Sequence, residues 1–211
     1  MFINRQDAGR QLAQQLKAVR GSDVVVLGLP RGGLPVGQEV ADLLAAPLDV
    51  IVVRKLPVPG QPELAMGAVG EDDVRVLNDD VLEHFSVSDE VLESVTEREW
   101  QNVARRVSSY RKGRTRASLV GRTALIVDDG IATGATARAA CQVARLYGAA
   151  RVVLAVPVAP RGWTGEFAGI ADECVAVDTP RRFIAVGAHY RDFDSTTDDE
   201  VVECLRRNLR K

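Results

Sequence analysis

The fold is decided by residues 123–136, whose sequence is Thr123-Ala124-Leu125-Ile126-Val127-Asp128-Asp129-Gly130-Ile131-Ala132-Thr133-Gly134-Ala135-Thr136. The stretch opens with an uninterrupted apolar run, which is typical of a strand covered on both faces and therefore of a mostly parallel sheet. Two carboxylates end that strand, and a loop of small residues and threonines leads into an amphipathic segment at 136–146. We expect a buried strand, a ligand-binding turn and a helix in succession.

The same alternation recurs elsewhere in the chain. Apolar, β-branched runs at 24–29, 48–53 and 152–158 predict three more strands, and amphipathic segments at 8–19 and 36–44 predict helices. Strands that alternate with helices indicate a doubly wound α/β fold with a mostly parallel sheet. In such folds ligands bind at the carboxyl ends of the strands, where the connecting loops gather.

Three segments depart from this alternation. Residues 56–70 are rich in proline, glycine and small residues, which predicts a long loop directly after a strand. Apolar residues about four apart over 88–111 predict a long amphipathic helix that starts at Ser88. A capping-box pattern from Thr197 to Glu200 predicts a terminal helix, whose basic end includes residues 206, 207, 210 and 211.

Composition bounds the class of protein. With 211 residues, 46% of them hydrophobic, the chain can form one domain over residues 1–211 with a full core. The 27 basic residues nearly balance the 29 acidic ones, so neither nucleic acid nor an anionic membrane is an expected partner. Cys141, Cys174 and Cys204 lie far apart and in no CxxC spacing, which argues against a disulfide framework or a thiolate zinc site. The sequence shows neither the pattern of a signal peptide nor an apolar run of about 20 residues. These features predict a cytoplasmic location.

The turn at 128–136 combines groups suited to a phosphorylated sugar. Backbone N–H groups at a helix start, together with the hydroxyls of Thr133 and Thr136, can surround a phosphate, and Gly134 allows close approach. The carboxylates of Asp128 and Asp129 cannot favourably face the same phosphate, but they suit ribose hydroxyls or Mg²⁺. An isolated Asp-Asp-Gly is more often a simple turn with a helix cap. The strand before it and the Thr-Gly-x-Thr after it favour the phosphate site.

Residues 125–136 closely resemble the signature that binds 5-phosphoribosyl 1-pyrophosphate (PRPP) in type I phosphoribosyltransferases, and the resemblance extends over nearly the whole chain. It implies that Asp128 and Asp129 bind the ribose hydroxyls and hold Mg²⁺, directly or indirectly. It also implies a homodimer. The residues it assigns to the 5-phosphate are Ala132, Thr133, Gly134, Ala135 and Thr136.

A second loop, containing Arg31, Gly32 and Gly33, follows the first predicted strand and resembles the pyrophosphate loop of the same family. Small residues expose backbone N–H groups to an anion, and Arg31 adds a fork of donors. A simple glycine turn is the alternative. Because both loops follow parallel strands, we expect them at the same edge of the sheet.

Arg54 and Lys55 end the next predicted strand, so they bring more positive charge to the same crevice. The resemblance places Lys55 on the pyrophosphate and implies a catalytic role for both residues together with Asp128 and Asp129. A solvated charged pair is the alternative. The resemblance also implies that the loop at about 56–70 is a mobile lid that excludes water from the reaction.

The resemblance further implies a small carboxyl-terminal hood over the acceptor base, at about residues 157–195. Within it, Phe183 resembles the aromatic residue that stacks on the base, although a core phenylalanine is nearly as good an interpretation. Ala132 stands where enzymes acting on hypoxanthine and guanine carry an acidic residue, which argues against that specificity. The acceptor base is left open.

Two functions follow. The first is transfer of 5-phosphoribosyl from PRPP to a nitrogenous base of unknown identity, with release of pyrophosphate. The alternative is a non-catalytic regulatory module that senses PRPP or a nucleotide. The expected lid and the two phosphate-binding loops favour the enzyme.

Overall fold

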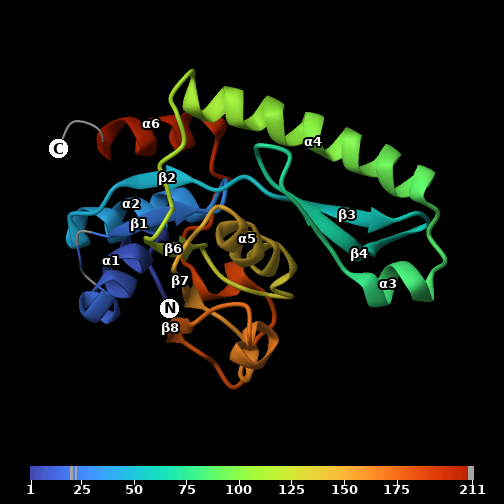
Figure 1. Cartoon of the computed structure of the whole chain (residues 1–211). Helices are drawn as coiled ribbons and strands as arrows, with labels where there is room; N and C mark the ends of the chain where they lie inside the picture. Colours follow the sequence, from blue (N-terminus) through green and yellow to red (C-terminus); the bar gives the residue numbers. More distant parts are fainter. Residues whose placement is uncertain (20, 22, 209–211) are drawn as a thin grey trace.

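Five parallel strands form the central sheet in the order β2-β1-β6-β7-β8 (Figure 1). The computed structural model describes residues 1–19, 21 and 23–208. Strand order reverses between β1 and β6, because the chain passes from β1 to β2 on one side and reaches β6, β7 and β8 on the other. The strands are β1 (Val24–Gly28), β2 (Leu48–Val50), β6 (Thr123–Val127), β7 (Arg151–Val158) and β8 (Glu173–Asp178). The mostly parallel α/β fold and the four predicted strands are confirmed.

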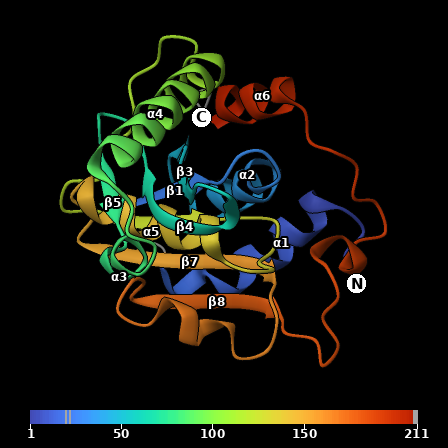
Figure 2. The same cartoon turned by 90° about the vertical axis from the view of Figure 1, so that its right-hand side faces the viewer.

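Helices cover both faces of this sheet (Figure 2). Successive strand residues point to opposite faces, so Val24 and Val26 join one apolar layer while Val25 and Leu27 join another. The first layer includes residues of α1, α2, α4 and α6, and the second is built on α5. The helices are α1 (Arg5–Gln15), α2 (Gly33–Leu44), α4 (Asp89–Arg111), α5 (Ala135–Leu146) and α6 (Asp198–Asn208). All five were predicted, and the predicted basic residues Arg210 and Lys211 lie outside the described residues.

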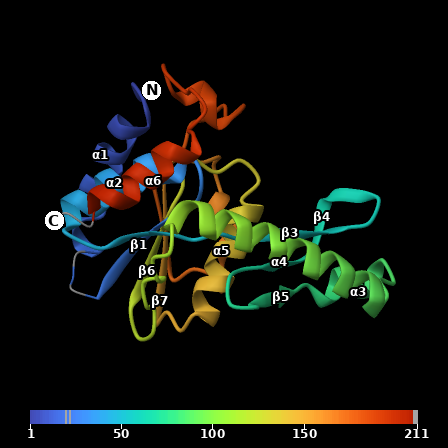
Figure 3. The same cartoon turned by 90° about the horizontal axis from the view of Figure 1, so that it is seen from above.

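The predicted loop at 56–70 is wrong in its local structure, because this segment forms most of an antiparallel sheet. β3 (Arg54–Val58), β4 (Gln61–Val69) and β5 (Arg75–Leu77) pair in that order, and α3 (Asp79–His84) follows. Pro57 is tolerated because it sits on an edge strand at a register shift, and Gly60 turns the chain with a φ of 78°. We call this sheet the arm. Figures 1 and 3 show it projecting from the central sheet with α4 along it.

The expected hood over 157–195 also needs correction, since it contains β8, the edge strand of the central sheet. β8 was missed because its six residues begin with Glu173, end with Asp178 and are only partly buried between them. Outside β8, this part of the chain has short 3₁₀ helices at Trp163–Phe167 and Val186–His189.

No helix in the described ranges is both long and apolar enough to span a membrane.

Candidate active site

The two predicted loops meet at the point where strand order reverses. A Cβ added to Gly32 would lie 1.9 Å from Oδ2 of Asp129, and one added to Gly33 would lie 2.5 Å from the carbonyl oxygen of Val127. Only glycine therefore allows the loop after β1 to lie against the end of β6. The Pro30–Arg31 peptide is cis. A crevice at a topological switch point is the usual ligand site of open α/β sheets.

Backbone donors in the loop after β1 are partly engaged already. The N–H of Gly33 donates to the carbonyl of Leu29 at 2.9 Å, and that of Leu34 donates to the carbonyl of Arg31 at 3.1 Å. Among the described residues, the N–H groups of Arg31 and Gly32 have no such partner. Those two groups are the donors that the loop can offer to an anion.

The loop after β6 leads into the amino terminus of α5, which has no side-chain cap. Gly134 adopts a φ of 71°, and α5 begins at the next residue without a side-chain cap. The N–H of Ile131 donates to the carbonyl of Val158 at 3.0 Å, which fixes the loop to the end of β7. Thr133 and Thr136 are exposed beside the first turn. Free N–H groups and the helix dipole make this end of α5 suited to a phosphate.

Burial dominates the electrostatics of the paired carboxylates. It raises the pKa of Asp128, and the neighbouring charge of Asp129 raises it further, although Oδ1 of Asp128 accepts a hydrogen bond from the N–H of Asp129 at 2.9 Å. Burial also raises the pKa of Asp129, and a hydrogen bond from Arg5 opposes that rise. A cation or hydroxyl donor placed here would stabilise the charged forms.

Mg²⁺ fits this donor set only in part. It prefers oxygen ligands in octahedral geometry, and two carboxylates supply oxygens of that kind. Within the described ranges, however, no group of three or more His, Cys, Asp or Glu side chains could hold a metal ion. The residues therefore suit an ion that brings most of its ligands with it as water and substrate phosphate oxygens.

Sequence reasoning missed Arg5, which lies in the first turn of α1. Its Nε donates to Oδ2 of Asp129 at 2.8 Å, and its Nη1 donates to the carbonyl of Asp194 at 2.6 Å. The guanidinium also lies 4.0 Å from the ring centroid of Phe193, and the hydroxyl of Tyr190 donates to the carbonyl of Asp129 at 2.6 Å. No local motif signals Arg5, because 124 positions separate it from Asp129.

The predicted cationic pair on β3 is divided between two faces. Lys55 lines a cavity of about 650 Å³ between the arm and α5, together with Thr133 and Ala135. Arg54 instead forms an ion pair with Glu99 of α4, at 3.1 Å. Adjacent residues of a strand point to opposite sides, so only one of the two can face the phosphate loop. The structure brings Lys55 to that loop and Arg54 to α4.

Arg31 extends from the loop after β1 toward α4 and α6. Its side chain is 49% exposed, and Nη1 lies 4.0 Å from Oδ1 of Asp198. Arg31 lines a small cavity with Arg105, Arg106 and Tyr110. An exposed pair at this distance is weak, so Arg31 can turn toward a ligand at low cost.

Phe183 lies half-buried against the cluster of Phe2, Val158 and Tyr190. Its ring stacks on His189, with centroids 5.5 Å apart and planes 15° apart. A cavity of about 280 Å³ lies between the phosphate loop and residues 160–163, 166 and 167, and Arg161 lines it together with the loop residues 131–134. Sequence reasoning gave Arg161 no role in binding.

The comparisons with known proteins define the class. The family model for the phosphoribosyl transferase domain matches residues 3–190, and the chain belongs to this family. Two strains of Mycobacterium tuberculosis, CDC 1551 and H37Rv, carry a protein named as a candidate phosphoribosyl transferase that is 58% identical over 207 residues. The match covers 98% of this chain and 47% of each relative, so the chain spans about half the length of these curated relatives.

Solved structures share the fold of this chain. The crystal structure of TT1426 from Thermus thermophilus superposes with a TM-score of 0.90 at 42% identity, and the match covers 98% of both chains. The AQ2163 protein of Aquifex aeolicus shares the fold at a TM-score of 0.52 and 12% identity. The predicted membership of the phosphoribosyltransferase family is confirmed.

Proposed function

We propose that this chain transfers 5-phosphoribosyl from PRPP to a nitrogen atom of a base and releases pyrophosphate. The observation that carries the proposal is the contact of Gly32 and Gly33 with the end of β6. It sets a small-residue loop beside Asp128 and Asp129, next to the open start of α5. Groups suited to a pyrophosphate, a ribose and a 5-phosphate thus lie in one crevice.

Each part of PRPP has a matching group in this crevice. The 5-phosphate binds the N–H groups and hydroxyls of residues 132–136 at the start of α5. The ribose hydroxyls donate to Asp128 and Asp129, whose buried carboxylates gain further hydrogen bonds beside those from the N–H of Asp129 and from Arg5. The pyrophosphate binds the N–H groups of Arg31 and Gly32, with the Arg31 guanidinium and Lys55 as additional cations.

The reaction breaks the bond between C1 of the ribose and the pyrophosphate oxygen, and that bond's electron pair leaves with pyrophosphate. The nitrogen of the base then donates its lone pair to C1, and the proton that this nitrogen carries is released to water. Positive charge develops on the ring, so Asp128 and Asp129 stabilise it, while Arg31 and Lys55 stabilise the leaving anion. Mg²⁺ held with the pyrophosphate beside Asp128 and Asp129 would neutralise further negative charge.

The alternative is a module that binds PRPP or a nucleotide without turnover. Such a module would use the same two loops and carboxylates, but it does not need the water exclusion that catalysis requires.

Pyrophosphate release from PRPP and Mg²⁺ across a panel of purine, pyrimidine and small nitrogen bases tests the enzyme. We expect release that depends on one base and disappears in the double variant Asp128→Asn, Asp129→Asn. PRPP binding that needs both carboxylates, without turnover on any base, would contradict the enzyme and support the sensor.

A further inference from the structure

The loop after β1 borders a cavity of about 350 Å³ that it shares with α4 and α6. Arg31 lines this cavity from the loop, Arg105 and Arg106 line it from α4, and Asp198 lines it from α6. Three guanidinium groups therefore share one small space with a single carboxylate. A cleft in which one sign of charge prevails attracts ions of the opposite sign, so the cavity suits an anionic ligand.

The two arginines of α4 have no acidic partner. Both are exposed, Arg105 donates to Oδ1 of Asn102, and Arg106 forms no ion pair or hydrogen bond within the described ranges. The neighbours three and four positions away on the helix are residues 101–103 and 108–110, none of which is acidic. Arginines that stabilise a helix surface pair with carboxylates at those spacings. The charge of Arg105 and Arg106 is therefore available to a ligand.

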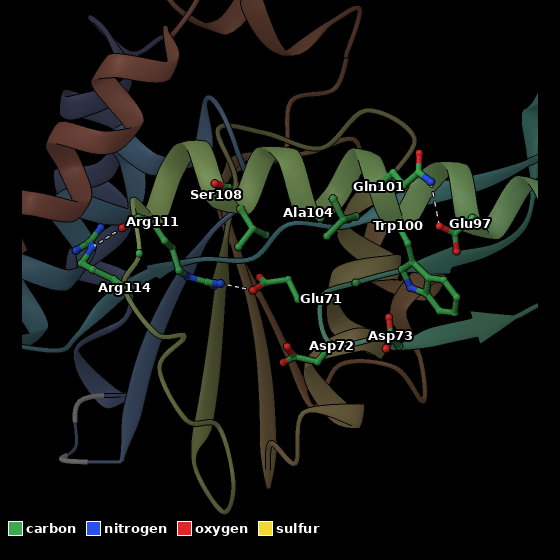
Figure 4. Close-up of a pocket in the computed structure, with 14 residues that line it drawn as sticks. Glu71, Asp72, Asp73, Glu97, Trp100, Gln101, Ala104, Ser108, Arg111 and Arg114 are labelled. Atoms are coloured by element: carbon green, nitrogen blue, oxygen red, sulfur yellow. Dashed lines mark hydrogen bonds and ion pairs between the residues drawn. The ribbon is translucent and has the colours of Figure 1, made fainter.

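Arg111, nearer the end of α4, is in the opposite situation. It is 3% exposed and donates to Asp49 at 3.0 Å, to the carbonyl of Val50 at 2.9 Å and to Glu71. Figure 4 shows its side chain directed at Glu71, in a separate cavity of about 550 Å³. Arg111 thus stabilises the fold and has little to offer an anion.

The carboxylate of the arginine-lined cavity does not neutralise the arginines around it. Oδ1 of Asp198 accepts a hydrogen bond from the hydroxyl of Tyr110 at 3.1 Å and lies 4.0 Å from Nη1 of Arg31. The side chain of Asp198 is 59% exposed, so water screens its attraction for Arg31. Burial raises the pKa of Tyr110, so this hydroxyl stays protonated and keeps donating to Asp198. The cavity keeps an excess of positive charge.

The loop after β1 connects this cavity to the crevice proposed for PRPP. The N–H groups of Arg31 and Gly32 have no backbone partner among the described residues, and the guanidinium of Arg31 lies in the arginine-lined cavity. Lys55, in contrast, lines the cavity beside Thr133 and Ala135 at the start of α5. Further positive charge beside the loop after β1 therefore comes from α4.

We propose that Arg105 and Arg106 complete the pyrophosphate subsite together with Arg31. This inference rests on the proposed function and extends it: the pyrophosphate lies between the N–H groups of the loop and the guanidinium groups of α4. A guanidinium binds two phosphate oxygens through parallel N–H donors. Negative charge grows on the pyrophosphate as its bond to C1 of the ribose breaks, and Arg105 and Arg106 stabilise that charge.

Calorimetry with two probes tests this assignment. Inorganic pyrophosphate reports on the subsite and ribose 5-phosphate reports on the loop at the start of α5, both with Mg²⁺ present. The double variant Arg105→Gln, Arg106→Gln should weaken pyrophosphate binding about tenfold or more and leave ribose 5-phosphate binding unchanged. The control is Arg206→Gln, Arg207→Gln, which removes two adjacent exposed arginines of α6 that do not line the cavity. It should bind both probes like the parent.

The outcomes separate this inference from the proposed function. The inference is overturned if the α4 double variant binds pyrophosphate like the parent, if it loses both probes equally, or if the α6 double variant loses pyrophosphate as strongly. The proposed enzyme still stands in those cases if PRPP is turned over. Weaker pyrophosphate binding in the α4 double variant, without turnover by the parent on any base, would support the subsite and contradict the enzyme. A parent protein that does not bind pyrophosphate would contradict both.

Discussion

Arg5 holds Asp129 although 124 positions separate them in the chain: the Nε of Arg5 lies 2.8 Å from the carboxylate oxygen that Gly32 also approaches. Helix α1, the end of β6 and the loop after β1 thus meet at one oxygen atom. The side chain of Arg5 is 11% exposed and that of Asp129 is 15% exposed, so water screens their attraction weakly. This pair sets the position and the charge of one of the two carboxylates assigned to ribose.

Arg5→Ala should weaken PRPP binding about tenfold, because Asp129 loses its fixed position. It should also raise the pKa of Asp129, since the hydrogen bond and charge of Arg5 oppose the rise caused by burial. The acidic limb of the pH profile for PRPP binding then moves to higher pH. Arg5→Lys, which keeps the charge, should show only part of this shift.

The control for that experiment is Arg10→Ala on the same helix, where the arginine is 57% exposed and 3.6 Å from Glu39. It should leave the pH profile unchanged. An Arg5→Ala protein with the parent's profile would show that the pair has no bearing on the site.

Gly32→Ala should lower kcat/KM for PRPP about 100-fold, or roughly 2.7 kcal/mol. The new methyl group would collide with Asp129 at 1.9 Å, so the loop after β1 must move away from the carboxylates. Gly165→Ala is the matched control, because no atom lies within 4 Å of its added Cβ. Steady-state kinetics with pyrophosphate detection would compare Gly32→Ala with Gly165→Ala. Equal activity of the two variants would contradict a crevice formed jointly by the loop after β1 and the carboxylates.

Asp128→Asn should abolish turnover and yet stabilise the free protein. Burial and Asp129 raise the pKa of Asp128 in the folded state, so the folded protein binds a proton that the unfolded chain releases. Stability from this group is therefore present at low pH and is lost as pH rises through the raised pKa. Asparagine avoids that loss, for a gain of about 1 kcal/mol, or roughly 2–4 °C in melting temperature at neutral pH.

Thermal unfolding at several pH values measures this effect. The gain should shrink toward pH 4, where Asp128 itself is protonated. Asp192→Asn, which removes an exposed carboxylate, should show neither the gain nor its pH dependence. A destabilised Asp128→Asn protein at neutral pH would mean that the buried charge is better compensated than its surroundings indicate.

Arg111→Leu should destabilise the fold by about 3–5 kcal/mol, because it leaves two buried carboxylates without their cation. Asp49 and Glu71 both depend on Arg111, and burial already raises the pKa of Glu71. Adding Glu71→Gln should recover part of the loss. Urea unfolding measures the free energy of unfolding of these variants, and Arg106→Leu, which changes an exposed arginine of the same helix, is the control. Equal losses of stability in Arg111→Leu and Arg106→Leu would contradict this prediction.

The sequence predicted those parts of the fold and site that depend on neighbours along the chain. The apolar run at 123–127, the carboxylates and the loop into α5 are contiguous, so their chemistry could be inferred before their geometry. The edge strand β8 was missed because its half-buried residues lack a strong pattern. The arm was taken for a loop because its prolines and glycines also suit edge strands and tight turns.

Contacts between distant segments could not be predicted in this way. Arg5 pairs with Asp129 across 124 positions, and the packing of α1 against α2, β7 and β8 brings them together. Arg54 and Lys55 looked equivalent as neighbours, but the strand turns them to opposite sides and Glu99 engages only Arg54. Such assignments need the three-dimensional arrangement of the strands.

The most direct test of the shared crevice is a crystal structure of the protein with PRPP and Mg²⁺. We predict the 5-phosphate at the start of α5, the ribose hydroxyls on Asp128 and Asp129, and the pyrophosphate against Arg31 and Gly32. PRPP bound elsewhere, or a crevice that stays empty at saturating PRPP, would contradict the account.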